Sequence, residues 1–258
     1  MGNSSLVSYT KISPNRSSPR NHEIDTISIH CVVGQCTVEA LGEVFAPTSR
    51  QASSNYGVGR DGRIGMYVEE KDRSWCTSSS SNDNRAITIE VASDTKHPYA
   101  VTDAAYEGLI KLLVDICQRN PGIKRLKWEG DKNLIGQVDK QNMTVHRWFA
   151  NKACPGEYLY ERHGEIAAEV NRRLDALERM ESDSMDVKRF EELWLEYRKG
   201  LQDNDASQYS EQARQWAVDN GLIAGNNATE FNGMWQDMLT REQFVTVLFR
   251  FAQMMGKA

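Results

Sequence analysis

The sequence predicts an α/β or α+β domain over about residues 1–177, followed by a small all-α module. Five segments carry this prediction, with strand patterns at 24–33, 62–70 and 85–93 and amphipathic helix patterns at 103–119 and 157–177. Strands and helices that share one segment are typical of these two fold classes. After residue 177 the helical periodicity continues without strands, which marks the change of module.

Polar segments separate these elements. The first two dozen residues include SPNRSSPRN and are predicted to be a surface lead-in. SSSSNDN at 78–84 is predicted to be a loop before the third strand. The helix at 103–119 ends at Asn-Pro-Gly, a sequence that helices rarely continue through. The helix at 157–177 carries one apolar stripe that includes Ile166 and Val170.

Two further segments are expected beyond residue 177. Residues 178–208 are predicted to be a helical linker, with a short amphipathic helix that carries Phe190 and Trp194. Residues 209–258 are predicted to form the separate module, with two helices around NGLIAGNNATEFNG. The second helix opens with Thr240 and Gln243 at the spacing of a capping box.

Composition limits the classes of partner. The chain has 258 residues, of which 40% are hydrophobic and 26% charged, so it can bury a core of ordinary size. The net charge of -5 argues against nucleic-acid binding through a basic face. The sequence contains no apolar run of about 20 residues, the length that would predict a membrane span. MGNSSLVSYTK lacks the features of a signal peptide, so we expect a cytosolic protein with no membrane partner.

Strand alternation selects two ionisable residues. In TISIHCV, Ile27 and Ile29 point to one face, which leaves His30 on the other face. In AITIEVA, Ile87 and Ile89 share a face, and Glu90 points away from it. If the two strands belong to one sheet, His30 and Glu90 lie on a common surface.

TVHRWFANKACPG brings a second histidine and a cysteine eight positions apart. Five cysteines without an export signal argue against a disulfide framework. His30, His146 and Cys154 would give zinc three N/S ligands and leave one position open for water, as in catalytic zinc sites. Glu90 would then move the proton of the water, and Lys152 would stabilise the oxyanion of a tetrahedral intermediate. These roles together make an amide hydrolase.

Other readings of the same residues remain. Cys154 and a histidine would make a nucleophile and its base in a cysteine protease, which needs an activated thiolate. Cys154 instead precedes Pro-Gly in an expected loop. The two residues can also be unrelated buried side chains, Glu90 a structural carboxylate and Lys152 a solvated surface lysine. The remaining histidines, including His163, have no motif around them and are expected on the surface.

TISIHC, AITIEVA and VHRWFANKACPG together resemble the zinc N-acetylmuramoyl-L-alanine amidases, which share a fold with peptidoglycan recognition proteins. Such domains occur in phage endolysins and bacterial autolysins, and the resemblance covers about residues 20–177. It implies a mixed central β-sheet flanked by helices, with the site in a groove. It also implies cleavage of the amide between the lactyl group of N-acetylmuramic acid and L-alanine.

The resemblance also assigns residues. It places the zinc ligands at His30, His146 and Cys154, the catalytic acidic residue at Glu90 and the family's lysine at Lys152.

One position departs from the family pattern. Many members carry a tyrosine where this chain has Ser54, shortly before the Asp-Gly turn. Tyr56 is close by and is kept as a candidate substrate contact, as is Trp148, whose alternative role is packing under the ligand loop. The missing tyrosine gives Glu90 more weight as the base.

The C-terminal module has its own resemblance. QWAVDNGLIAG and MLTREQFVTVLFRF resemble the S-layer homology motif, whose family anchors proteins to secondary cell-wall polysaccharide. Arg241 is the candidate contact for an anionic sugar substituent, or else an ordinary surface arginine. Apolar residues on a two-helix unit need a cover, so we also expect homo-oligomer formation through this module.

The combined prediction is a peptidoglycan hydrolase with Zn2+ as cofactor. The missing export signal fits an endolysin that stays in the host cytoplasm until a pore releases it to the cell wall, and a bacterial autolysin is the other setting. A peptidoglycan recognition protein without turnover is the alternative function. The complete ligand set favours the enzyme, whereas the missing tyrosine favours the receptor.

Overall fold

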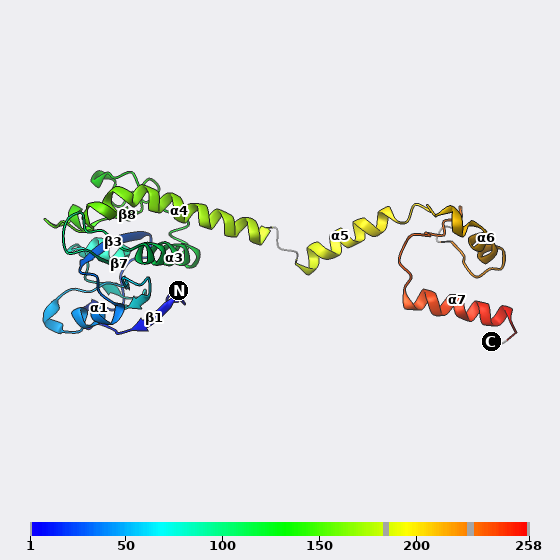
Figure 1. Cartoon of the computed structure of the whole chain (residues 1–258), viewed down its shortest axis with the longest axis horizontal. Helices are drawn as coiled ribbons and strands as arrows, with labels where there is room; N and C mark the ends of the chain where they lie inside the picture. The colour runs from blue at the N-terminus through cyan, green and yellow to red at the C-terminus, as the bar shows by residue number, and fades with distance from the viewer. Residues whose placement is uncertain (1, 183–185, 226–229, 257–258) are drawn as a thin grey trace. The chain divides into compact units, whose positions relative to one another are not determined.

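A six-stranded mixed β-sheet forms the centre of the first of two compact units, residues 1–182 and 183–258 (Figure 1). The structure is a computed structural model that describes residues 2–182, 186–225 and 230–256. The mixed sheet and its flanking helices confirm the predicted α/β class.

Sheet order places two long strands at the centre. Along the sheet the strands are β1 (Val7–Thr10), β5 (Ile64–Met66), β4 (Tyr56–Val58), β7 (Ala86–Ser93), β3 (Thr26–Val33) and β8 (Met143–Thr144). Only β4 and β5 pair antiparallel among these neighbours. A separate two-stranded sheet joins β2 (Arg16–Ser17) to β6 (Arg73–Ser74).

The helices and 3-10 turns of this unit lie between and around the strands. They are α1 (Val38–Phe45), η1 (Thr48–Arg50), α2 (Ser80–Arg85), α3 (Asp103–Arg119), η2 (Lys132–Leu134), η3 (His146–Trp148) and α4 (Gly156–Ser182). The helix predicted at 103–119 has these same bounds, because the Thr102 side chain caps its first turn by accepting from the Ala105 N–H.

The main core lies on one face of β3 and β7. Their alternate residues Ile27, Ile29, Ile87 and Ile89 are fully buried in a cluster with the apolar residues of α3 and α4, which run beside the strands (Figure 1). Burial of one such side chain contributes about 1.5–3 kcal/mol. This face is therefore closed, and Ser28, His30, Thr88 and Glu90 lie on the opposite face.

Helix α1 covers another part of the sheet. Leu41 and Tyr67 form a second cluster there, next to Gly57 of β4. A Cβ atom at Gly57 would stand 2.4 Å from a Leu41 methyl carbon and 2.7 Å from the Tyr67 ring, so glycine is what permits this close approach.

Two expectations about polar segments were wrong. The N-terminal lead-in is part of the fold, because β1 pairs with β5 and the buried Asn15 side chain donates to the carbonyls of Phe45 and Pro47. The loop expected at 78–84 contains α2, whose first turn is capped by the Ser79 hydroxyl accepting from the Asn82 N–H. The strand expected at 62–70 extends only over β5.

The second unit is helical. It contains α5 (Val187–Gly200), η4 (Gln208–Ser210), α6 (Glu211–Asp219) and α7 (Arg241–Met254). The predicted capping box of Thr240 and Gln243 is present at the start of α7. Leu222 is the one large apolar side chain that is buried among the described residues of this unit. No helix in the described ranges is long and apolar enough to cross a membrane.

Candidate metal centre and active site

His30 and Glu90 lie side by side on the polar face of the sheet. Strands β3 and β7 are parallel and in register, with His30 opposite Glu90. Side chains at the same register of paired strands point to the same face, so the two residues share a surface as the alternation predicted. His30 is completely buried, whereas Glu90 is partly exposed.

The chain returns to this surface at residues 146–154. Strand β8 pairs with β3 and leads directly into η3, which begins with His146. Cys154 comes just before α4, and its backbone carbonyl accepts from the Arg147 N–H, which closes the loop between the two residues. One donor atom each of His30, His146 and Cys154 lies within 4.8 Å of the others.

The imidazole and thiol groups of this cluster are in direct contact. The Cys154 Sγ lies 3.3 Å from Nδ1 of His30, and the rings of His30 and His146 have centroids 5.2 Å apart. Burial lowers the pKa of both histidines, with His146 adding to the effect on His30 and Lys152 to that on His146. Both imidazoles are therefore neutral at neutral pH, which is the form that binds metals.

Glu90 has the properties of a base. Burial raises the pKa of its carboxyl group to about 7, against a smaller lowering by the charge of Arg50. Its Oε1 accepts from the Cys76 thiol at 3.9 Å, whereas its buried Oε2 has no hydrogen-bond partner in the described part of the chain. A buried carboxylate oxygen without a partner marks a place where a ligand or water binds.

A cavity of about 460 Å³ opens beside His146 and Lys152. Three cations line it, Arg50, Arg73 and Lys152, although the chain as a whole carries a net charge of -5. The acid of the wall is Asp83, whose carboxylate already accepts from the N–H groups of Cys76 and Thr77 and from the Thr77 hydroxyl. The cavity is therefore suited to an anionic or carbonyl-rich ligand.

Sequence reasoning missed part of this wall. Arg50, Arg73 and Cys76 lie at the cavity, and none belongs to a recognisable motif. Arg50 ends η1, and the next residue, Gln51, has a φ of 51°, the left-handed conformation. Only the tertiary fold brings these residues to His146.

The structure does not support Tyr56 as a substrate contact. Tyr56 is opposite Ile89 in the pair of β4 and β7, and therefore on the apolar face away from Glu90. Its ring is fully buried, and its hydroxyl donates to Glu70 at 2.6 Å and accepts from the Ser4 N–H. The prediction for Tyr56 was wrong because it rested on closeness in sequence and left out the face of the strand.

Trp148 packs beneath the segment 146–154, which carries His146 and Cys154. The residue is only 8% exposed, and its ring stacks on Trp128 with centroids 5.1 Å apart and planes 3° apart. His163 packs on the same Trp128 ring at 4.4 Å and is fully buried, so its expected surface position was wrong. This arrangement favours the packing role for Trp148 over the substrate contact.

The two other candidates from the sequence, Lys152 and Arg241, are both exposed to solvent. Lys152 is exposed at the mouth of the cavity next to His146. Arg241 is exposed in the second unit, where it opens α7.

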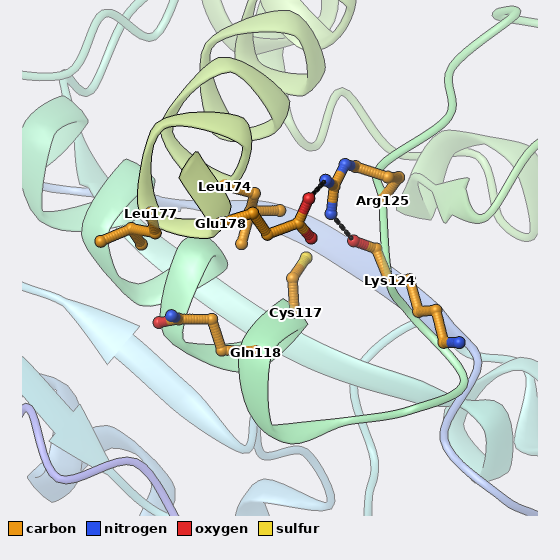
Figure 2. A pocket seen from close by; sticks show the side chains of 7 residues that line it. All are labelled: Cys117, Gln118, Lys124, Arg125, Leu174, Leu177 and Glu178. Atoms are coloured by element: carbon orange, nitrogen blue, oxygen red, sulfur yellow. Dashed lines mark hydrogen bonds and ion pairs between the residues drawn. The ribbon is translucent and has the colours of Figure 1, made fainter. Parts of the chain in front are cut away.

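A separate cavity of about 590 Å³, lined by none of the candidate site residues, lies between the ends of α3 and α4 (Figure 2). Arg125 donates there to Glu178 and to the Lys124 carbonyl, as the dashed lines show. Burial raises the pKa of the Cys117 thiol at this cavity to about 12, so the thiol is unreactive at neutral pH. Because Arg125 and Glu178 are paired with each other and the thiol is unreactive, this cavity is not the candidate active site.

Comparison with known proteins gives a family. The family model described as N-acetylmuramoyl-L-alanine amidase matches residues 20–157, more than half of the chain, and this range contains the three clustered donors and Glu90. Comparison with curated proteins finds no match.

Three solved structures illustrate the likeness. AmpD is 21% identical, with 64% of this chain and 96% of that chain covered and a TM-score of 0.46. The amidase LysC from Clostridium intestinale URNW is 19% identical, with 64% and 95% covered and a TM-score of 0.41. Peptidoglycan recognition protein-LE is 15% identical, with 62% and 92% covered and a TM-score of 0.47. By the match of its family model, the chain belongs to the N-acetylmuramoyl-L-alanine amidase family.

Proposed function

We propose that this protein is a zinc-dependent peptidoglycan amidase that cleaves the bond between N-acetylmuramic acid and the L-alanine of the stem peptide. The observation that carries the proposal is the convergence of His30, His146 and Cys154 beside Glu90, whose Oε2 has no hydrogen-bond partner among the described residues. Family membership supports the substrate, and the charged cavity next to the cluster supplies room for it.

The donor set fits zinc. Two neutral imidazoles and one cysteine sulfur are ligand types that zinc prefers, and three protein ligands are the number found in catalytic zinc sites. Burial raises the pKa of the Cys154 thiol, so its thiolate form needs a cation nearby. Zinc bound by these residues supplies Lewis-acid activation of water and of the amide carbonyl.

The chain's own residues perform the proton transfers. Glu90, with a pKa of about 7, takes a proton from the attacking water and returns it to the departing L-alanine amine. Lys152, exposed at the cavity that His146 also lines, stabilises the negative charge that develops on the carbonyl oxygen.

A cysteine-nucleophile mechanism fits these residues poorly, although Cys154 lies 3.3 Å from His30. Such a mechanism needs a thiolate beside an imidazolium. The pKa of Cys154 is raised and the pKa of His30 is lowered, mainly by burial in each case, and both shifts favour the neutral pair.

We propose that the second unit directs the enzyme to the cell wall. In this proposal residues 1–177 are the catalytic domain, 178–208 a helical linker and 209–258 a module for secondary cell-wall polysaccharide, with Arg241 as a contact. The setting is that of an endolysin held in the host cytoplasm until its release to the wall.

Self-association through the same module is part of the proposal. Among its exposed apolar residues, Phe244, Leu248, Phe251 and Met255 are spaced four, three and four residues apart, a repeat typical of helices that pack together. Light scattering of the full chain at micromolar concentration is expected to give a mass above 29.3 kDa. A monomeric mass would remove this part of the proposal.

One assay separates the amidase from its alternative. Purified peptidoglycan is treated with the wild-type protein, with chelated protein before and after zinc is restored, and with Cys154→Ser. The amidase releases L-alanine amino groups without reducing sugar ends, and chelation or Cys154→Ser abolishes the release. Binding without release, by protein shown to hold zinc, would instead establish a recognition protein.

A further inference from the structure

Ser28 lies behind the donor cluster, two residues before His30 and on the same face of β3. Its side chain is fully buried, with Oγ 3.0 Å from Nε2 of His30 and 3.3 Å from the Thr144 carbonyl oxygen. We propose that Ser28 is a positioning residue, which fixes His30 in the tautomer whose Nδ1 is free to bind the metal. The inference rests on the proposed function, because it concerns the attachment of zinc.

The number of available protons determines the tautomer. A serine hydroxyl donates one proton, and a carbonyl oxygen can only accept. Because Ser28 is sealed from solvent, the hydroxyl satisfies Thr144 only by donating to it. Its oxygen then accepts from Nε2–H of His30. A neutral imidazole has one N–H, so Nδ1 keeps its lone pair.

The nitrogen left free is the one that faces the other donors. Nδ1 of His30 lies 3.3 Å from the Cys154 sulfur. In the opposite tautomer Nδ1 would carry the proton, and the Ser28 hydroxyl would have to donate to Nε2. The Ser28 oxygen would then face the Thr144 carbonyl oxygen with no proton between them. Burial excludes a water that would relieve that contact.

Ser28 also connects the two histidine-bearing segments. It is the register partner of Thr144 in the pair of β3 and β8, and His146 follows Thr144 by two residues. One hydroxyl therefore links the strand of the first histidine to the strand that delivers the second. Hydrogen bonds to the second nitrogen of a ligating imidazole hold its ring and raise its affinity for metal.

His146 offers an internal comparison. Its Nε2 lies 3.0 Å from the Ser78 hydroxyl, but that contact is exposed. Water can replace the Ser78 hydroxyl there, whereas it cannot reach Ser28. Loss of the Ser28 hydroxyl is therefore expected to weaken zinc binding more than loss of the Ser78 hydroxyl.

The first measurement is made on the wild-type protein, with one variant used only to assign the signal. Nitrogen-15 NMR of histidine-labelled, metal-free full chain reports which ring nitrogen of His30 is protonated, and a His30→Gln sample assigns the signal. The expected result is a proton on Nε2. A proton on Nδ1 would overturn the proposal. This measurement stands even if the wild-type protein binds no zinc, a result that would count against the proposed function alone.

The second measurement is zinc affinity, by competition with a chromophoric chelator. Ser28→Ala is expected to weaken affinity about 10- to 100-fold. Ser53→Ala is the matched control, because Ser53 is also fully buried, donates to the Asn15 carbonyl and accepts from the Trp75 N–H. Thermal unfolding of the metal-free proteins compares their folded states. Equal zinc affinity of Ser28→Ala and the wild type would refute the role of Ser28.

Discussion

His30 and Glu90 are direct register partners across the parallel strands β3 and β7. The distance between the imidazole that we propose as a metal ligand and the carboxylate beside it is therefore set by strand pairing, which positions side chains more precisely than a loop does. The face that carries them is defined by the isoleucines on the other side of both strands, all of which are buried. The core that stabilises the fold thus also orients the site.

Glu90→Gln tests the role of the carboxylate. Glutamine keeps the shape of the side chain but cannot accept a proton, so kcat is expected to fall by about 100- to 10,000-fold. Zinc content should be unchanged, because Glu90 is not among the proposed ligands. Release of L-alanine amino groups measures the first quantity and atomic absorption the second.

The control for this variant is Glu161→Gln on α4, where the glutamate is exposed. It should retain full activity. Wild-type turnover by Glu90→Gln would assign the proton transfer to another group.

Arg50→Gln tests the charge that acts on Glu90. The base must be ionised, so kcat/KM rises with pH through the pKa of Glu90, which is about 7. Arg50 lowers that pKa, and its removal therefore moves the rise of kcat/KM to higher pH. A pH–rate profile measures the shift, and any loss that persists at high pH reports substrate contacts of Arg50.

Arg60→Gln is the matched change for this profile, since Arg60 is exposed and does not line the cavity. The rise of kcat/KM with pH in Arg60→Gln should coincide with that of the wild type. If kcat/KM of Arg50→Gln rises at the same pH as that of the wild type, Arg50 does not act on the base.

Lys152→Met tests oxyanion stabilisation. Loss of one such group costs about 100- to 1,000-fold in kcat, and a larger effect on kcat than on KM is expected because the charge develops only in the transition state. Kinetics on a soluble muramyl peptide separate the two constants. Lys96→Met, at another exposed lysine, controls for the loss of charge. Equal kcat in both variants would leave Lys152 as a solvated surface residue.

The sequence predicted those parts of the site that follow from local periodicity. Alternation in β3 and β7 placed His30 and Glu90 on one face, because a strand's two faces are fixed by its own residues. The approach of Cys154 to His30 joins residues 124 positions apart. Periodicity says nothing of such a pairing; we expected it from the ligand types that zinc prefers, and the family resemblance supported it.

The features that the sequence-based predictions got wrong or left out have a common physical cause. Strand β1 has only four residues, two partly exposed and two exposed, and its pairing partner β5 lies more than 50 positions away. The burial of Tyr56 follows from its register with Ile89, which requires knowing that β4 joins β7. Arg50 reaches the cavity through a turn that carries no motif. Each depends on which distant segments meet, and the local pattern does not contain that information.

His163→Asn tests how the aromatic cluster beneath the ligand loop responds to acid. Burial lowers the pKa of His163 to about 4, from 6.5 for an unhindered histidine. Its Nδ1–H donates to the Leu159 carbonyl at 2.7 Å, and its buried Nε2 has no partner among the described residues. Protonation would place an unpaired charge against Trp128, so the folded state resists it.

The sign of the effect follows from proton binding. Between pH 6.5 and 4 the unfolded chain binds more protons at His163 than the folded chain does, so the free energy of unfolding falls as the pH falls. This histidine alone accounts for a loss of about 3 kcal/mol over that interval. His163→Asn retains a donor for Leu159 but cannot be protonated. Urea unfolding of metal-free wild type and variant should therefore show a shallower pH dependence in His163→Asn, while His22→Asn, at an exposed histidine, should match the wild type. Parallel curves for His163→Asn and the wild type would show that His163 is accessible to protons in the folded state.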